Sequence, residues 1–464
     1  MTSVHPNTEQ AYKLFHAGTL AFARAEQQGI RIDLEYCVKT GKHLQRKIDR
    51  LEERFRGTKF YKHWKHSLQK TPNINSNPQL GKFLYEVKKL KPTTTTVTGK
   101  GSTEEDALTQ LRIPELNDLL KIRKLRKLKD TYLEGFQKEQ VRSYIHPNFN
   151  LNLARTFRSS SSNPNFQNIP KRDKEAMKII RKALYPRPGH QFLEVDFGQL
   201  EVRIAACYHK DPTMLTYIKD PTKDMHRDMA EQIFMMDSFD KTIESHQILR
   251  AATKNGFVFP EFYGDYYGNC AVNMACGWGK LPEGRWRKGQ GIDFNGGTLA
   301  DHLIKKEIKS IDHFREHIRK IEKDFWKRRF PVYAKWKDTW WELYQKNGYI
   351  DMLTGFRCSG LMGRNDAINY PVQGAAFHCL LWSFIELDRI IYEKGYKSRL
   401  IGQIHDAVVL DIHPEELNVI APLIRRILTV DLPKAWPWII VPLDIEMDLG
   451  KVDGSWAELH PYEF

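Results

Sequence analysis

The chain has 464 residues, more than one hydrophobic core usually supports, so we expect a protein of several lobes. Its 72 Lys and Arg residues outnumber 57 Asp and Glu residues, and the formal net charge of +15 favours a polyanionic partner. A basic protein whose charge serves only solubility is the alternative that composition leaves open.

Six scattered cysteines lack the paired spacing of a zinc site and the density of a secreted disulfide scaffold. The N-terminus lacks the apolar core of a signal peptide, and no apolar run is long enough to span a bilayer. These features predict a soluble cytoplasmic protein.

The first third of the chain is rich in basic side chains, with apolar residues at helical spacing. In the stretch 116–136 an apolar stripe faces away from cations that include Lys121 and Lys124. The pattern predicts a helical lobe with a basic face, which could be a solvated surface or a phosphate contact. Residues 91–106, rich in Thr and Gly, predict an exposed loop before it.

Residues 154–170 are too polar for a core element. The stretch could be a plain connection, but several of its side chains can donate hydrogen bonds to phosphates and groove edges. These candidates are Arg158, Asn165, Gln167 and Asn168.

Two aspartates are predicted at the ends of buried strands. A β-rich run ends in Asp196, after which helical spacing resumes. Two further apolar strands, 400–404 and 408–412, flank a predicted turn with His405 and Asp406. Either aspartate alone could cap a turn or start a helix, but two adjacent carboxylates would repel unless protonated or bridged by cations. Mg²⁺ suits such oxygen ligands, and a pair of ions can serve phosphoryl transfer.

Arg250 and Lys254 lie four residues apart on one face of a predicted helix, where they repel unless an anion such as a triphosphate lies beside them. Aromatic residues follow that could support a base or a sugar. They are Phe257, Phe259, Phe262 and Tyr263. A basic helix followed by an ordinary aromatic core is the alternative.

These stretches resemble motifs of the family A DNA polymerases, the class that contains bacterial DNA polymerase I and related phage replicative enzymes. DFGQLEVR (196–203) is similar to motif A, RAATKNGFVFPEFYG (250–264) to motif B, and QIHDAVVL (403–410) to motif C. Other stretches, such as EQQGIRID, SSSSNPNFQNIP and VPLDIEMDLG, follow in the order of that family, so the resemblance covers nearly the whole chain.

The resemblance implies an α+β fold shaped as a right hand, with an antiparallel palm sheet and helical fingers and thumb. The implied divisions are an N-terminal segment (1–28), the thumb and its approach (29–150), a first palm segment with motif A (151–211), the fingers with motif B (212–347) and a second palm segment with motif C (348–464).

The resemblance also implies roles for single residues. Two Mg²⁺ ions, which Mn²⁺ could replace, would be held by Asp196, Asp406 and the backbone carbonyl of Phe197. The incoming nucleotide would contact Arg250, Lys254, His226, Gln199, Glu201, Phe259, Tyr263 and Arg181. The DNA would contact Arg158, Asn165, Gln167, Asn168, Asn369, Gln373, Gln403, His405, Lys121 and Lys124. The residues with catalytic roles would be Asp196, Asp406, Arg250, Lys254, Glu201 and Tyr263.

The implied function is template-directed addition of deoxynucleotides to a primer 3′ end by a two-metal-ion mechanism. Primer-template DNA and deoxynucleoside triphosphates would be the partners, with a separate exonuclease or other replication proteins, in a bacterial or phage-infected cell. The chain starts almost at the thumb, so no 3′ to 5′ exonuclease domain is expected within it. A binding homologue with weakened catalysis, a single-subunit RNA polymerase and a reverse transcriptase are the alternatives. Glu201 favours a DNA polymerase, because its side chain would close the space that a ribose 2′-hydroxyl needs.

Three features depart from the family pattern. Ala407 stands where motif C usually has an acidic residue, and we expect the chain to polymerise with it in place. Motif B has one extra residue, so the sugar-facing aromatic could be Phe257 or Phe259, and strict counting lands on Val258. Leu281–Gly297 resembles an insertion in the fingers without an assigned role.

Overall fold

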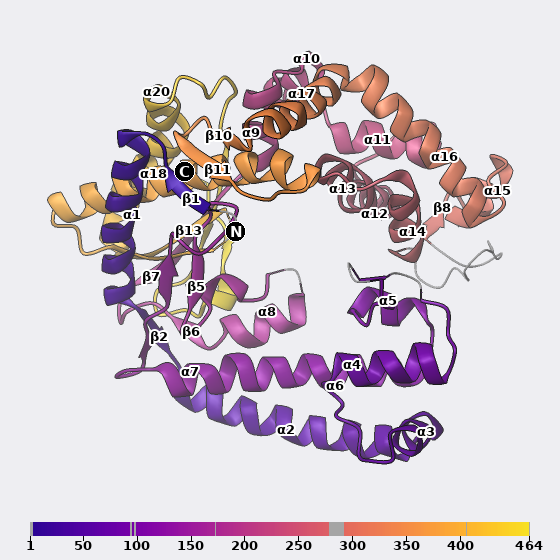
Figure 1. Cartoon of the computed structure of the whole chain (residues 1–464). Coiled ribbons are helices and arrows are strands. Elements are labelled where there is room, and N and C mark those ends of the chain that lie inside the picture. Colours follow the sequence, from indigo (N-terminus) through magenta and orange to yellow (C-terminus); the bar gives the residue numbers. More distant parts are fainter. Residues whose placement is uncertain are drawn as a thin grey trace.

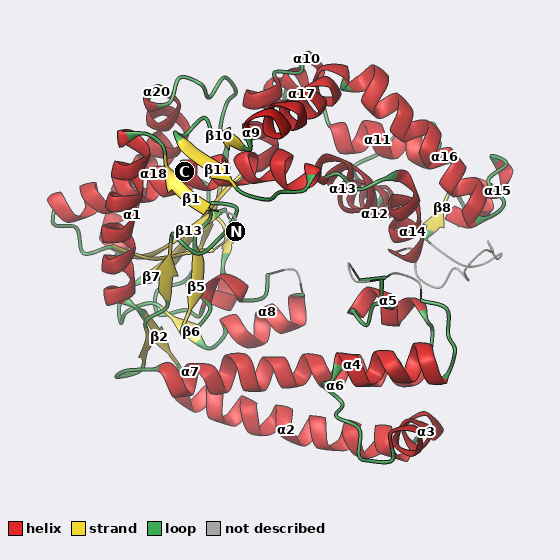
Figure 2. Cartoon of the chain, in the orientation of Figure 1, coloured by secondary structure: helices red, strands yellow, loops and turns green. Residues whose placement is uncertain are grey.

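The computed structural model describes residues 3–92, 95–96, 99–171, 173–277, 292–404 and 406–463. One lobe contains a central sheet, and two further lobes are helical (Figure 2). Helices α2 to α7 lie along one side of the molecule and α10 to α16 along another, with the sheet beside both (Figure 1). The expected α+β fold is confirmed. No helix within these ranges is both long and apolar enough to cross a membrane.

The central sheet has five strands in the order β12-β13-β7-β14-β15, and all neighbouring pairs are antiparallel. Its strands are β7 (Gln191–Phe197), β12 (Arg399–Ile404), β13 (Ala407–Ile412), β14 (Ile445–Leu449) and β15 (His460–Pro461). Apolar residues, many of them β-branched, fill β7 and β13, and nearly all their side chains are buried. The two strands predicted around motif C are thus present as β12 and β13.

Long helices pack against this sheet and against each other. They are α1 (Glu9–Gln28) and α18 (Arg364–Glu393). Strand β1 (Ser3–Pro6) pairs with β11 (Phe356–Ser359), which also pairs with β10 (Tyr349–Asp351). The N-terminal segment therefore packs into the same lobe as the C-terminal part of the chain.

Shorter elements complete this lobe. They are β2 (Ile30–Ile32), β3 (Tyr144–Ile145), β4 (Asn148–Asn150), β5 (Ser160–Ser162), β6 (Leu184–Tyr185), α8 (Lys174–Arg181), α9 (Leu200–His209), α19 (Leu417–Arg426), α20 (Leu432–Ala435), a π-helical turn (Ile427–Asp431) and 3₁₀ helices (Phe166–Asn168, Pro414–Glu416 and Trp456–Glu458).

The first helical lobe is built around two long helical stretches that run side by side (Figure 1). Its elements are α2 (Leu34–Gly57), α3 (Lys59–Leu68), α4 (Asn77–Gly81), α5 (Glu105–Gln110), α6 (Pro114–Arg126), α7 (Glu134–Glu139) and π-helical turns at Lys82–Val87 and Lys127–Leu133. The predicted apolar stripe is buried, because Leu116, Leu119 and Leu125 are at most 2% exposed where α6 packs against α2. The loop expected at 91–106 is only partly described.

The second helical lobe contains motif B. Its elements are α10 (Pro212–Lys219), α11 (Met225–Ile233), α12 (Glu244–Thr253), a π-helical turn (Lys254–Val258), α13 (Phe259–Tyr263), α14 (Tyr267–Gly277), β8 (Asp293–Phe294), β9 (Gly297–Thr298), α15 (Leu299–Lys305), α16 (Ile311–Asp324), a second π-helical turn (Phe325–Arg329) and α17 (Pro331–Asn347). Phe262 packs against Phe325 and Tyr333 and so ties motif B to the start of α17. Most of the predicted insertion, Leu281–Gly297, lies outside the described residues.

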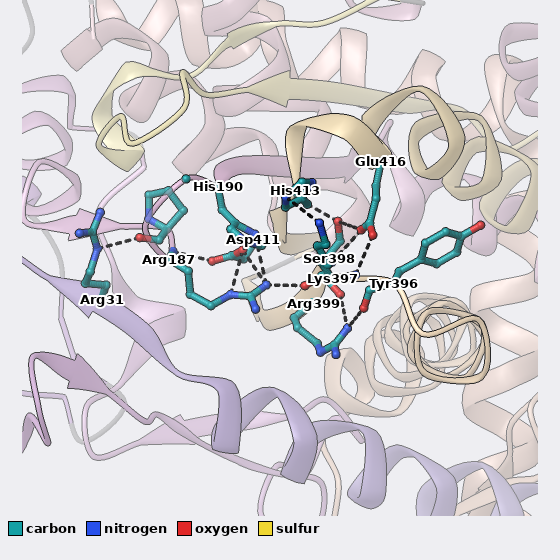
Figure 3. A network of polar contacts seen from close by, with 12 residues as sticks. Arg31, Arg187, His190, Tyr396, Lys397, Ser398, Arg399, Asp411, His413 and Glu416 are labelled. Atoms are coloured by element: carbon teal, nitrogen blue, oxygen red, sulfur yellow. Dashed lines mark hydrogen bonds and ion pairs between the residues drawn. The ribbon is translucent and has the colours of Figure 1, made fainter.

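A polar network holds the end of β13 that is remote from Asp406 (Figure 3). Asp411 is 2% exposed and accepts hydrogen bonds from the backbone N–H of Arg187 (2.7 Å) and from its guanidinium (3.0 Å). The ring of His190 lies 2.6 Å from the same carboxylate, and Arg187 also donates to the carbonyl of Lys397 (2.6 Å). Because Asp411 pairs with Phe192 of β7, these contacts fix the register of the two central strands.

We predict that Asp411→Ala lowers the free energy of unfolding by about 2–3 kcal/mol, because Arg187 loses a buried, hydrogen-bonded carboxylate. The measurement is urea-induced unfolding followed by intrinsic fluorescence. Asp351→Ala is the matched control, since the side chain of Asp351 is 46% exposed beside Arg357, and it should cost less than about 1 kcal/mol. Equal effects of the two changes would contradict a buried anchoring role for Asp411.

Candidate functional site

Asp196 and Asp406 end neighbouring strands at the same edge of the central sheet. Asp196 pairs with Ala407 across β7 and β13, and the backbone N–H of Phe197 donates to the carbonyl of Asp406 at 3.2 Å. Burial raises the pKa of Asp406, and the negative charge of Asp196 raises it further. The structure therefore brings together the two predicted carboxylates in mutual repulsion.

This donor set fits a hard divalent cation. The two carboxylates, and the backbone carbonyl of Phe197 directly after Asp196 in the sequence, offer only oxygen ligands. Within the described ranges, no group of three or more His, Cys, Asp and Glu side chains is arranged to hold a metal. Mg²⁺ tolerates such a sparse set, because it binds few protein carboxylates and keeps water and substrate phosphates as ligands.

Two side chains outside the predicted site residues, Lys171 and Glu194, lie close to Asp196. Lys171 Nζ lies 2.7 Å from Asp196 Oδ2 and 3.3 Å from Glu194 Oε1. Although burial alone would raise the pKa of Glu194, the charges of Arg181 and Lys171 lower it below its ordinary value. Glu194 had a sequence signal, because it lies two residues before Asp196 in an apolar strand and so shares its face.

Arg181, which is expected to contact the incoming nucleotide, has protein partners in this structure. Its side chain is buried, donates to Glu194 Oε2 at 2.7 Å, and stacks with its guanidinium carbon 4.2 Å from the centre of the Trp456 ring. The last turn of helix α8 places it against Glu194, 13 residues further along the chain, and against the distant Trp456. Arg181 is therefore an internal counter-ion of the sheet lobe.

The extra residue of motif B lies in a π-helical turn. The backbone N–H of Phe259 bonds to the carbonyl of Lys254, five residues back, so the turn holds one residue more than an α-helical turn. Phe257 and Val258 are both fully buried, whereas the partly exposed ring of Phe259 lies 5.3 Å from Lys254 Nζ. Of the three candidates left open by the sequence, Phe259 shares the face of the basic residues.

The two cations of motif B lie beside an acidic residue and a buried histidine. Arg250 Nε donates to Asp224 Oδ2 at 2.6 Å, and Asp224 also caps the start of α11. His226, 2% exposed, packs edge-on against Phe259, and neither ring nitrogen has a hydrogen-bond partner among the described residues. Burial, together with the charges of Arg250 and Lys254, lowers the pKa of His226 to about 4.

Glu201 joins motif A to motif B. One carboxylate oxygen contacts the guanidinium of Arg158 and the other accepts from the hydroxyl of Tyr263. The amide of Asn369 in α18 donates to the carbonyl of Tyr263 at 3.0 Å. Gln373 follows one turn later and lines a pocket with Glu201 and Tyr263. Four predicted site residues from different regions of the chain thus meet Glu201 or its surroundings.

Gln199 lies at the junction between Asp196 and this group. Its backbone adopts the left-handed conformation, with φ of 53°, and its side chain is exposed. Non-glycine residues rarely adopt this conformation, and they gather at functional sites.

The predicted polar loop is partly turned inward. Gln403, which is predicted to contact DNA, is only 2% exposed, and its side-chain oxygen accepts hydrogen bonds from Ser159 (2.8 Å) and Gln167. Asn165 and Asn168 are exposed, and the Asn165 side chain accepts from the N–H of Asn168. Gln403 therefore holds the Gln167 side chain from the buried side of the loop. His405 lies outside the described residues.

Ion pairs engage some of the predicted basic face. Lys124 Nζ lies 2.5 Å from Asp173 and 3.4 Å from Glu175, and the hydrogen bond to Asp173 raises its pKa. Lys124, which is predicted to contact DNA, is therefore paired with two carboxylates in this structure. Lys121 and Lys127 are exposed and, in the described part of the chain, have no ion pair.

The sequence profile described as "DNA polymerase family A" matches residues 35–275 and 309–458, so the chain belongs to this family. DNA polymerase I of Chloroflexus aurantiacus is 27% identical over 461 residues, which cover 94% of this chain and 42% of that protein. The thermostable DNA polymerase I of Thermus filiformis is 28% identical over 445 residues, which cover 94% and 47%. The chain thus spans less than half of these relatives.

A solved structure shares the fold. The POL domain of Pol1 from M. smegmatis, in complex with DNA primer-template and dNTP, has a TM-score of 0.71 at 24% identity, over 96% of this chain and 70% of that chain. The implied right-hand fold is confirmed by this likeness.

We predict that His226 makes stability depend on pH. The folded pKa of about 4 lies below the ordinary value of 6.5, so the unfolded chain binds the extra proton as the pH falls. The contribution of neutral His226 to the free energy of unfolding is fully present above pH 6.5 and is lost as the pH falls towards 4. His226→Asn should therefore lose less unfolding free energy than the wild type between pH 7 and pH 5, measured by urea unfolding at each pH. His43→Asn, at an exposed position, should keep the wild-type dependence. Identical pH profiles for wild type and His226→Asn would contradict the prediction.

Proposed function

We propose that this chain is a DNA-directed DNA polymerase, which extends a primer 3′ end with deoxynucleotides copied from a template. The observation that carries the proposal is the joining of all three motifs. Asp196 of motif A pairs with the motif C strand, and Glu201 of motif A contacts Tyr263 of motif B. The named relatives are DNA polymerases I, and the structural neighbour holds primer-template and dNTP, which supports DNA and nucleotides as partners here.

The carboxylates Asp196 and Asp406, with the carbonyl of Phe197, would hold two divalent cations. When bound, such cations activate the attacking oxygen and stabilise the leaving oxygen in phosphoryl transfer. Mg²⁺, or Mn²⁺ in its place, matches the oxygen donors.

The motif B face would bind the triphosphate. Arg250 and Lys254 supply positive charge, and Arg250 exchanges its contact with Asp224 for a phosphate. His226 is neutral near pH 7, so it offers hydrogen bonds without adding a third repelling charge. Phe259 gives a flat surface on the same face for the sugar or base.

The DNA would lie along the polar loop, α18 and the basic helix. Exposed amides of this loop can donate to phosphates and groove edges, and Asn369 and Gln373 extend the row from α18. Lys121 adds a phosphate contact. Glu201, held by Arg158 and Tyr263, closes the space beside the sugar and so favours deoxynucleotides over ribonucleotides.

We predict that Asp196→Asn and Asp406→Asn each lower the rate of primer extension at least about a thousandfold, because each removes charge that the cations require. Duplex affinity, measured by fluorescence anisotropy, should change little, since it depends on the cationic surface. Asp237→Asn is the control, because its side chain is 86% exposed and outside the site. Substantial extension by either site variant, or no extension by the wild type with any divalent cation, would contradict the proposed function.

We predict that Glu201→Ala lowers discrimination against ribonucleotides at least about tenfold, because truncation opens the space beside the sugar. The measurement is the ratio of kcat/KM for a deoxynucleotide and its ribonucleotide. Glu201→Gln keeps the volume and serves as the matched control, so it should keep most of the discrimination. An unchanged ratio in Glu201→Ala would mean that another residue excludes ribonucleotides. A wild-type chain that already prefers ribonucleotides would instead indicate an RNA polymerase.

A further inference from the structure

Lys171 lies on the carboxylate that the proposed function assigns to metal binding. Its ammonium group is 2.7 Å from Asp196 Oδ2, and both side chains are partly exposed, at 40% and 36%. Lys171 directly follows the polar loop (154–170) and lies just before α8, which begins at Lys174. A partly exposed lysine side chain ordinarily samples many positions. The contact with Asp196 therefore persists only if other residues restrict the lysine.

Glu194 holds Lys171 from the side of the sheet. This carboxylate is 3% exposed, and Oε2 accepts hydrogen bonds from Arg181 (2.7 Å) and from the Trp456 indole (3.0 Å). Its other oxygen, Oε1, lies 3.3 Å from Lys171 Nζ. With one oxygen fixed by two buried donors, Glu194 cannot rotate away, so its other oxygen keeps pointing at the lysine.

Charge alternates along this row. Arg181, Glu194, Lys171 and Asp196 follow one another as cation, anion, cation and anion. On the neighbouring strand β13, the residues opposite Asp196 and Glu194 are Ala407 and a valine, which carry no charge. On the other neighbouring strand, β14, Glu446 lies opposite Asp196 and Asp448 lies opposite Glu194. The charges of Glu194 and Asp196 add to the effect of burial in raising the pKa of Asp448, so Lys171 is the cation of a row rich in carboxylates.

We propose that Lys171 is a positioning residue that occupies the metal side of Asp196 until a divalent cation displaces it towards Glu194. The proposal rests on the proposed function for the identity of the metal site. A divalent cation bound at Asp196 would lie close to the Lys171 ammonium group, which is 2.7 Å from Oδ2, and the two positive charges would repel each other. Glu194, fixed by Arg181, offers the displaced lysine a partner without a large movement. Lys171 thus keeps Asp196 oriented without metal and weakens metal binding until the phosphates of a nucleotide add negative charge.

The test measures Mn²⁺ binding to the full chain without DNA or nucleotide, by the loss of the free Mn²⁺ signal in electron paramagnetic resonance. Lys171→Met should bind Mn²⁺ roughly tenfold more tightly than the wild type, because a partly screened competing charge is removed. Lys171→Arg keeps the charge and should stay within about twofold of the wild type. Glu194→Gln should shift the affinity in the opposite direction and weaken binding, since the lysine loses its alternative partner.

The double variant Asp196→Asn/Lys171→Met should lose the increase in Mn²⁺ affinity. That loss would assign the increase to the site at Asp196. Equal or weaker Mn²⁺ binding by Lys171→Met would overturn the proposal. If Lys171→Met does not fold, Lys171→Gln carries the same expectation. In primer extension, the half-saturating Mg²⁺ concentration should fall in Lys171→Met. A wild type that never extends primers would refute the proposed function, whereas unchanged Mn²⁺ binding in an active Lys171→Met variant would refute only the role of Lys171.

Discussion

The mutual repulsion of Asp196 and Asp406 is the constraint on which the rest of the site depends. Two carboxylates at one edge of a sheet are unfavourable unless cations lie beside them, and burial of Asp406 raises that cost. The antiparallel register fixes how close they come, because Ala407 lies directly opposite Asp196. The buried network around Asp411 at the other end of the strands protects that register, so a structural ion pair far from the site helps to preserve its chemistry.

Basic side chains of this chain offset part of the repulsion between the two carboxylates. Lys171 contacts Asp196, and both Lys171 and Arg158 oppose the rise in the pKa of Asp406. Arg158 also contacts Glu201, which in turn accepts from Tyr263. Asp196, Asp406, Glu201 and the motif B helix are therefore one electrostatic unit, and a change of charge at one position should alter the others.

The sequence predicted what depends on local pattern. The strands around both aspartates, the buried leucine stripe of α6 and the family were all evident, because hydrophobic period and short motifs are local properties. The sequence did not show contacts between distant positions. Glu194 accepts a hydrogen bond from Trp456, 262 residues away, and the guanidinium of Arg181 lies over the ring of the same tryptophan. Burial of Gln403 under the polar loop likewise depends on how two separate segments fold over each other. Such contacts leave no periodic signal, so the sequence could not show which polar side chains are internal partners.

The π-helical turn in motif B shows how a helix can accept an inserted residue. An added residue rotates an ideal α-helix by about 100° beyond that point, which would move every later side chain to another face. The wide turn confines this rotation to Lys254–Val258 and leaves Tyr263 directed at Glu201. In principle the wide turn could migrate along the helix and exchange one outward side chain for its neighbour. Burial of Phe257 and Val258 opposes this, because exposing either would cost about 1.5–3 kcal/mol. Apolar packing behind the helix thus selects one of two helical registers, and with it the aromatic ring that lies beside Lys254.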